Sequence, residues 1–233
     1  MLEDAIRYPL NSDDRLATLV IGGALLLLSF LILPIFVVQG YLMRVLRSTA
    51  GGDTAAPSFT DWGELFVDGL KLVVVSLVYG IAVSIPFVVA AVVVGIGGLT
   101  GSDAGLAAFG VVGVLLFLLA TLTAILVSYL LPAALTNFAL EGRIGAAFDF
   151  GTIREAALSG KYLIGVLLGV VLNGIIGTVA GPFAVILVGF PILFYGQVVS
   201  YYCFARGFAE STDTGRSAGP ATAHADRPET DSL

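Results

Sequence analysis

Long apolar stretches alternate with short polar ones along the chain, and charged residues are confined to the polar stretches. No Asp, Glu, Lys or Arg occurs at residues 16–43, 72–102, 104–140 or 162–205. A membrane-spanning helix needs roughly 20 apolar residues, so each stretch is long enough to cross a bilayer. The pattern predicts an all-α, polytopic helical membrane bundle with about five transmembrane helices. The expected spans are residues 16–46, 70–96, 106–140, 161–181 and 183–208.

Two segments that precede expected spans, residues 59–69 and 150–160, have an amphipathic pattern instead. In each, apolar residues recur at intervals of three and four on one helical face, and in the first segment Asp61, Glu64 and Asp68 occupy another face. Short helices of this kind lie in the headgroup plane of a bilayer. The shared spacing also suggests a duplicated unit of one interfacial helix followed by two spans. The residues expected to anchor these helices to the membrane surface are Phe59, Trp62, Phe66, Phe150 and Ile153.

A stripe of small residues runs along the expected fourth span. Gly165, Gly169, Gly177 and Gly181 recur every fourth residue, and Asn173 occupies the missing position. In hydrocarbon, helices associate where small residues let their backbones approach and where polar side chains find partners. We therefore expect this stripe to pack against a neighbouring helix.

The remaining segments complete the expected domain organisation. Residues 1–15 form a short polar N-terminal arm, and residues 16–209 form the transmembrane domain. The first span is long, and Pro34 is expected to kink it. Residues 210–233 are rich in Ser, Thr, Asp and Ala and nearly free of apolar side chains, which predicts a disordered acidic tail.

Basic residues predict the orientation. Arg and Lys flank the first and third connections and follow the last span, whereas the second and fourth connections have none. Because basic residues in short loops stay inside, the first and third connections and the tail are expected to be cytoplasmic. An odd number of spans then places the N-terminus outside, although Arg7 and Arg15 favour the inside. A re-entrant hairpin in the first apolar run is the alternative that keeps both of its ends inside.

Composition supports a membrane location and limits the partners. Hydrophobic residues make up 58% of the 233 residues, charged residues only 12%, and the mean hydropathy is +1.00. Soluble domains carry about a quarter charged residues. The net charge of -6 and the pI near 4.6 resemble haloarchaeal proteins and argue against nucleic-acid binding, which needs a basic surface.

Four amides are the candidate functional groups at membrane depth: Gln39, Asn137, Asn173 and Gln197. They either line a polar path or form interhelical hydrogen bonds, and for Asn173 the structural role is favoured. None is ionisable, which argues against proton-coupled transport.

The inventory for catalysis is poor. The sequence shows no nucleophile paired with a base, no metal-ligand spacing and no phosphate-binding loop. The lone Cys203 lies in an apolar stretch, and the lone His224 lies in the tail. We expect no catalytic, cofactor-binding or metal-binding residues, no cofactor and no enzymatic activity.

Several segments together carry a resemblance to a known family. They are LPIFVVQGYLMRVLRST, FTDWGELFVDGLK, YLLPAALTNFALEGRIGAAFDFGTI and GKYLIG. These resemble an uncharacterised family of archaeal and bacterial integral membrane proteins, known only as a domain of unknown function, from Asp4 to Phe208. The resemblance implies a multispanning protein of the cytoplasmic membrane and brings no activity or site residues. The linkers are also distantly similar to those of membrane domains attached to some glycerophosphodiester phosphodiesterases, whose hydrolase domain this chain lacks.

The sequence thus predicts a multi-pass protein of the cell membrane without a defined activity. The favoured function is a non-enzymatic helical bundle that associates with lipids or binds a partner, and the alternative is a small-solute permease. Expected partners are membrane lipids, a second copy of the chain or another membrane protein, and not nucleic acid.

Overall fold

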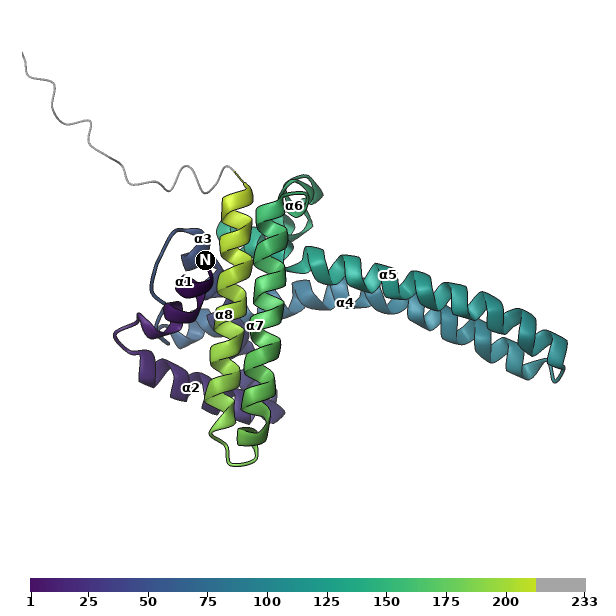
Figure 1. The fold of residues 1–233 in the computed structure, drawn as a ribbon, viewed down its shortest axis with the longest axis horizontal. Coiled ribbons are helices and arrows are strands. Elements are labelled where there is room, and N and C mark those ends of the chain that lie inside the picture. The colour runs from purple at the N-terminus through teal and green to yellow at the C-terminus, as the bar shows by residue number, and fades with distance from the viewer. Residues whose placement is uncertain (213–233) are drawn as a thin grey trace, which may run out of the picture.

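The structure is a computed structural model that describes residues 1–212, and all regular elements in this part of the chain are helical (Figure 1). The expected disordered tail therefore lies mostly outside the described residues, while Glu210 and Ser211 form the last turn of α8. In chain order the elements are α1 (Leu2–Arg7), η1 (Tyr8–Leu10), α2 (Arg15–Leu27), η2 (Leu28–Leu31), α3 (Leu33–Ala50), α4 (Trp62–Leu99), α5 (Asp103–Glu141), η3 (Ile144–Phe148), α6 (Phe150–Ala157), α7 (Gly160–Ala184) and α8 (Gly189–Ser211).

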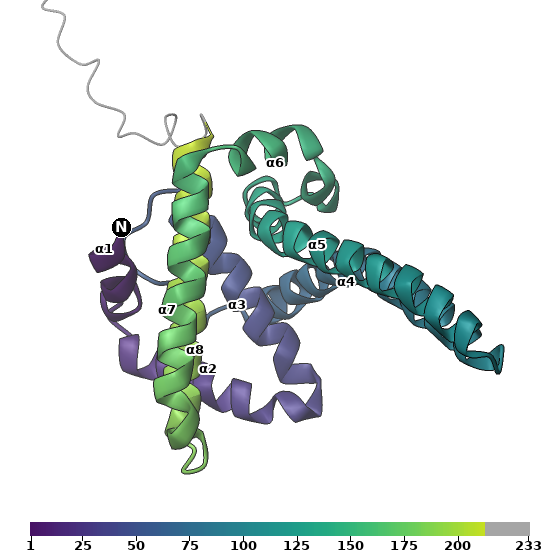
Figure 2. The ribbon, with the colours of Figure 1, turned by 45° about the vertical axis from the view of Figure 1, so that its right-hand side comes forward.

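Two helical hairpins dominate the molecule. Helices α4 and α5 form a long antiparallel arm that extends far beyond the other elements, and α7 and α8 form a second hairpin that points in a different direction (Figures 1 and 2). Helices α1 and α2 pack against α8, α3 packs against both α4 and α8, and α6 lies beside the base of α5. The molecule therefore consists of a compact body and a protruding arm.

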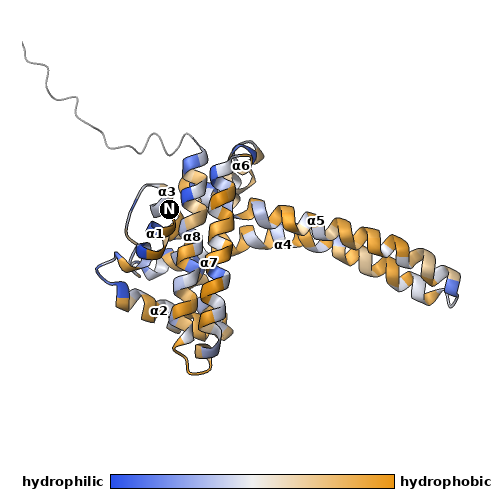
Figure 3. Cartoon of the chain, viewed as in Figure 1, coloured by the Kyte–Doolittle hydropathy of each residue, from blue (hydrophilic) through white to orange (hydrophobic). Residues whose placement is uncertain are grey.

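Three helices are long and apolar enough to cross a membrane, namely α4, α5 and α7. Only 11%, 11% and 22% of their most apolar windows is buried within the protein. Figure 3 shows this apolar character along the whole arm. An apolar surface of this size is typical of helices that lipid surrounds, and it indicates a membrane protein.

The structure does not confirm the expected count of five spans. The count of three rises to four if the bent pair Leu2–Leu10 and Arg15–Leu31 forms one broken span. Helix α8 is not among the apolar helices because it carries polar side chains such as Gln197, three tyrosines and Arg206.

The first apolar run differs from the single kinked span expected over residues 16–46. It forms two helices, α2 and α3, which the 3-10 turn η2 separates, and Ile32 at the break has a positive φ of 68°. Pro34 lies in the first turn of α3 instead of kinking a continuous helix. The first turn tolerates proline because its backbone N–H groups have no partner within the helix.

The two amphipathic linkers also adopt different structures. The first does not form a separate helix, because residues 62–69 are the opening turns of α4 and Phe59 precedes that helix. The second linker forms the separate helix α6, which ends at Ala157, and α7 begins only at Gly160 with the Ser159 hydroxyl as its N-cap. Similar spacing in the sequence therefore does not give the same local structure.

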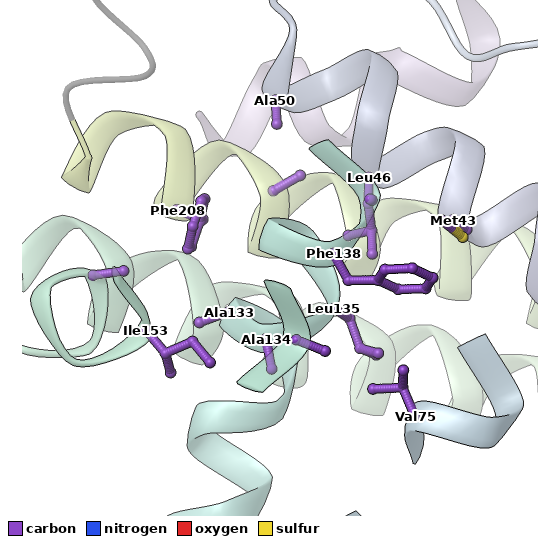
Figure 4. Packing of buried hydrophobic residues seen from close by; sticks show 14 of the residues in the cluster. Met43, Leu46, Ala50, Val75, Ala133, Ala134, Leu135, Phe138, Ile153 and Phe208 are labelled. Carbon is purple, nitrogen blue, oxygen red and sulfur yellow. The ribbon is translucent and has the colours of Figure 1, made fainter. Parts of the chain in front are cut away.

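The buried core lies where the base of the arm meets the body. Phe138 and Leu135 of α5, Leu46 of α3, Val75 of α4 and Phe208 of α8 belong to one cluster (Figure 4). Six helices thus contribute to this cluster, since Ile153 of α6 and Tyr162 of α7 join it as well. The core fixes the base of the arm, whereas its outer part packs only as a two-helix hairpin.

Helices α3 and α4 approach most closely at two glycines. A Cβ atom on Gly40 would lie 1.8 Å from the Leu65 carbonyl oxygen, and one on Gly69 would lie 1.7 Å from the Phe36 carbonyl oxygen. Any side chain at either position would collide with backbone, so this crossing requires glycine on both helices.

Candidate functional site

A network of charged side chains lies at the base of the arm, between α3 and the start of α4. Asp68 is 8% exposed and accepts from two cations, Arg47 at 3.3 Å and Lys71 at 3.1 Å. Glu64, which is more exposed, lies 3.8 Å from Arg44 and 4.0 Å from Arg47. Glu64 and Asp68 of the first linker are therefore paired with arginines of α3 and do not form a cation site.

The two arginines also bind backbone oxygens. The Arg47 Nε donates to the Ala139 carbonyl at 2.9 Å, near the C-terminal end of α5, where unpaired carbonyls favour a cation. Arg44 donates to the Ser58 carbonyl at 3.3 Å and to both oxygens of Thr60 at 3.0 Å. The network thus joins α3, the connecting loop, α4 and the end of α5. Because Asp68 is buried, removing it would leave Lys71 without its counter-charge and Arg47 with only the more distant Glu64.

Asn137 lies in this region and has a structural partner. Its side chain is buried and donates to the Ala146 carbonyl at 2.9 Å, while the Tyr79 hydroxyl donates to the Ala147 carbonyl at 2.7 Å. Both acceptors belong to η3, the irregular turn between α5 and α6. Buried backbone carbonyls need hydrogen-bond partners, and Asn137 supplies one.

A tyrosine hydroxyl is inserted into α5 at its proline. The Ala133 N–H donates to the Tyr162 hydroxyl at 2.9 Å, and this hydroxyl donates to the Tyr129 carbonyl at 2.7 Å. In a regular helix Ala133 would donate to Tyr129 directly. Pro132 disturbs that turn, and the hydroxyl from α7 bridges the gap. The Tyr129 hydroxyl in turn donates to the Ala157 carbonyl at 2.6 Å and holds the end of α6.

The other three predicted amides lie apart from this arrangement. Asn173 is exposed on α7. A Cβ atom added to Gly196 of α8 would lie 3.1 Å from the Asn173 Oδ1. Gln39 and Gln197 are half-buried. Within residues 1–212 no hydrogen bond joins any two of the four amides. They do not form one polar cluster.

The glycine stripe of α7 divides into two halves. A Cβ on Gly165 would lie 2.7 Å from the Cys203 carbonyl of α8, and one on Gly169 would lie 2.6 Å from the Phe204 ring. Nothing lies within 4 Å of the corresponding position on Gly177 or Gly181. The first half of the stripe therefore faces α8, and the second half faces no other part of the described chain.

The expected membrane anchors also separate into two groups. Phe59 stacks on Tyr41 with 4.3 Å between ring centroids, and Phe66 packs edge-on against Phe36 at 5.4 Å. Ile153 is 1% exposed and belongs to the core, so it does not anchor the surface as expected. The apolar faces of the linkers pack largely against the protein because a helix beside the body buries its apolar side there.

Two anchors remain accessible to lipid: Trp62 is 48% exposed and Phe150 is 63% exposed.

Apolar grooves lie on the outside of the bundle. One of about 220 Å³ is lined by α3, α5 and α8, and another of about 630 Å³ lies along the arm between α4 and α5. A third, of about 370 Å³, lies between α5 and α6. None of these three is lined by Gln39, Asn137, Asn173 or Gln197.

Sequence reasoning missed the tyrosines. Besides those at η3 and Pro132, the Tyr41 hydroxyl donates to the Pro57 carbonyl at 2.9 Å and the Tyr195 hydroxyl donates to the Ile6 carbonyl at 2.6 Å. The available signal was their position inside apolar stretches, since a buried tyrosine hydroxyl needs a partner.

The chain was compared with protein families, curated proteins and solved structures. The model of a family described as "Protein of unknown function (DUF4013)" matches residues 25–199. The chain belongs to this family. The DUF4013 region includes the charged network, the whole arm and the Tyr162 bridge, whereas α1 and most of α2 lie before it. No curated protein and no solved structure matches the chain.

Proposed function

We propose that this DUF4013 protein is a non-enzymatic, multi-pass protein of the cell membrane that associates with lipids or a membrane partner. In this proposal the α4–α5 arm is surrounded by acyl chains, and the charged network lies at the cytoplasmic membrane surface. The protein acts as a binding scaffold and needs no cofactor.

The apolar arm is the observation that carries the proposal. At 1.5 Å per residue its helices of 38 and 39 residues are each about 57 Å long, well beyond the roughly 30 Å of a hydrocarbon core. Large exposed side chains such as Val88 on α4 and Leu115 on α5 cover both helices, and the arm's turn at Gly101 is polar. A surface of this kind is unstable in water and requires lipid or another protein.

The base of the arm supports an inner-surface location. Arg44, Arg47 and Lys71 gather there, and basic residues of short loops are retained on the cytoplasmic side. Trp62, exposed at the start of α4, lies beside this network, and Trp is enriched at membrane interfaces.

The amides lend less support to a small-solute permease. Asn137 is hydrogen-bonded to η3 and Asn173 is exposed on α7, so these two do not line a common path in this conformation.

Reconstitution into liposomes tests the proposal against the permease. We expect the wild-type chain to stay with the vesicles after an alkaline carbonate wash and to leave small-solute flux at the level of empty vesicles. Trp62→Ala should weaken vesicle retention or thermal stability, whereas Asn173→Leu should leave both unchanged. Solute flux that Asn173→Leu abolishes would contradict the scaffold and establish the permease.

A further inference from the structure

We infer that the groove between α5 and α6 binds one anionic membrane lipid, with its phosphate on Arg154 and an acyl chain in the groove. This inference rests on the proposed function, since it requires that lipid surround the arm. It goes further by naming the site and the charge of the lipid.

Helix α6 presents two different faces. Ile153 and Ala156 are buried and attach the helix to the core. Phe150, Arg154 and Leu158 follow one another at intervals of four, so they form one stripe along the helix. All three line the groove. Phe150 and Leu158 remain well exposed, which leaves an apolar stripe with a single cation at its centre.

The side of the groove that belongs to α5 is apolar. Leu126, Tyr129 and Leu130 line it, and the Tyr129 hydroxyl is already engaged by the Ala157 carbonyl. Leu122 and Leu118 continue the row of Leu126 along α5 at intervals of four, and all three are exposed. The groove thus opens onto the lipid-facing surface of the arm, which suits an acyl chain more than a compact soluble ligand.

Among the described residues, Arg154 is the only charged side chain that lines the groove. Within residues 1–212 it has no hydrogen bond or ion pair from its guanidinium, unlike Arg44, Arg47 and Arg143. The neighbouring acids do not neutralise it: Asp149 caps the start of α6, and Glu155, the next residue, projects from a different side of the helix. A cation beside an apolar groove is complementary to a lipid phosphate, which the guanidinium binds through two N–H groups.

Lipid binding to the full chain in detergent micelles tests the inference. Native mass spectrometry would compare adducts of phosphatidylglycerol and phosphatidylcholine with identical acyl chains. We expect the wild type to bind phosphatidylglycerol in preference to phosphatidylcholine. Arg154→Gln should weaken the binding of phosphatidylglycerol about fivefold, which is the effect of one basic residue near an anionic membrane surface. Arg154→Lys should retain most of the preference. Arg143→Gln, which removes an exposed cation outside the groove, should leave it unchanged.

A second pair of variants tests the groove itself. Leu126→Trp fills it and should reduce binding of both lipids, whereas Leu118→Trp, on the same face but beyond the groove, should not. Inorganic phosphate should neither bind nor compete, because it lacks the acyl chain.

Equal adducts of both lipids on the wild type, no effect of Arg154→Gln or Leu126→Trp, or competition by inorganic phosphate would each overturn the inference. Retention of the Arg154→Gln chain in carbonate-washed vesicles separates this failure from that of the proposed function. If the wild type itself left the vesicles, the proposed function would fail as well.

Discussion

At the level of single residues, tyrosine hydroxyls are the hydrogen-bond partners of backbone groups that have no partner within their own helix or turn. The Tyr162 hydroxyl bridges the Ala133 N–H and the Tyr129 carbonyl in place of their direct hydrogen bond. The Tyr79 hydroxyl donates to a carbonyl of η3. A buried donor or acceptor without a partner costs the full desolvation of that group, and hydrocarbon offers no water to replace it. These hydroxyls therefore hold the Pro132 turn of α5 and the backbone of η3 in place.

Tyr162→Phe is expected to lower the free energy of unfolding in detergent by about 1–3 kcal/mol, because it leaves the Ala133 N–H without a partner. Thermal unfolding followed by circular dichroism measures the change. Tyr201→Phe is the control, since the Tyr201 hydroxyl has no hydrogen bond within the described residues. Equal stability of the two variants would show that the bridge contributes nothing.

Asp149 predicts a pH dependence of α6. Its carboxylate accepts from the Thr152 hydroxyl at 3.0 Å and from the Gly151 and Thr152 N–H groups, and these bonds lower its pKa. The contribution is therefore complete above the ordinary carboxyl pKa and is lost as the pH falls through the lowered value. Hydrogen exchange of α6, corrected for intrinsic rates, should rise in that acid range in the wild type and stay constant in Asp149→Asn. The same acid response in both would disprove the role of this carboxylate.

At the level of elements, periodicity in the sequence identified most helices but not their partners. The apolar windows of α4, α5 and α7 were recognisable because length and hydropathy suffice to define them. Gly40 and Gly69 belong to no stripe, yet they make the tightest crossing, whereas Gly177 and Gly181 continue a regular stripe and face nothing. Regular spacing shows that one face of a helix carries small side chains. Only the tertiary structure shows which helix, if any, packs against that face.

The candidate site was predictable only in part for the same reason. The sequence singled out Asn137 as a polar group in an apolar helix, but its acceptor lies in a turn whose course no pattern indicated. Amphipathicity located α6, but it could not tell that Ile153 faces protein while Phe150 stays exposed. Apolar faces look alike in the sequence whether protein or lipid covers them.

Substitution of Gly40 tests the crossing of α3 and α4. Gly40→Ala places a Cβ 1.8 Å from the Leu65 carbonyl oxygen, and such overpacking costs about 1–3 kcal/mol or more. We expect a clear loss of thermal stability in detergent. Gly177→Ala is the control, since it meets nothing within 4 Å and favours the helix. An unchanged melting temperature of Gly40→Ala would mean that the two helices are not in close contact.

At the level of the whole molecule, the arm and the body have different surroundings. The body has its own core cluster, which includes Tyr41, Phe194 and Tyr202, whereas the outer part of the arm shows apolar side chains on nearly every side. The two hairpins point in different directions (Figures 1 and 2), so both cannot stand upright in one flat bilayer in this arrangement. The arm is the part whose exposed apolar surface requires lipid, so its location in the membrane decides whether the proposed function holds.

Cysteine labelling in lipid vesicles tests that location most directly. In a chain whose buried Cys203 is replaced by Ala, single cysteines would be placed at Ser102 in the turn of the arm, at Val89 on α4 and at Leu119 on α5. With a water-soluble maleimide present on both sides of the membrane, we expect rapid labelling at position 102. Positions 89 and 119 should be labelled only after the vesicles are solubilised and the protein is unfolded. Equally rapid labelling at all three positions in intact vesicles would show that water surrounds the arm and would contradict the account.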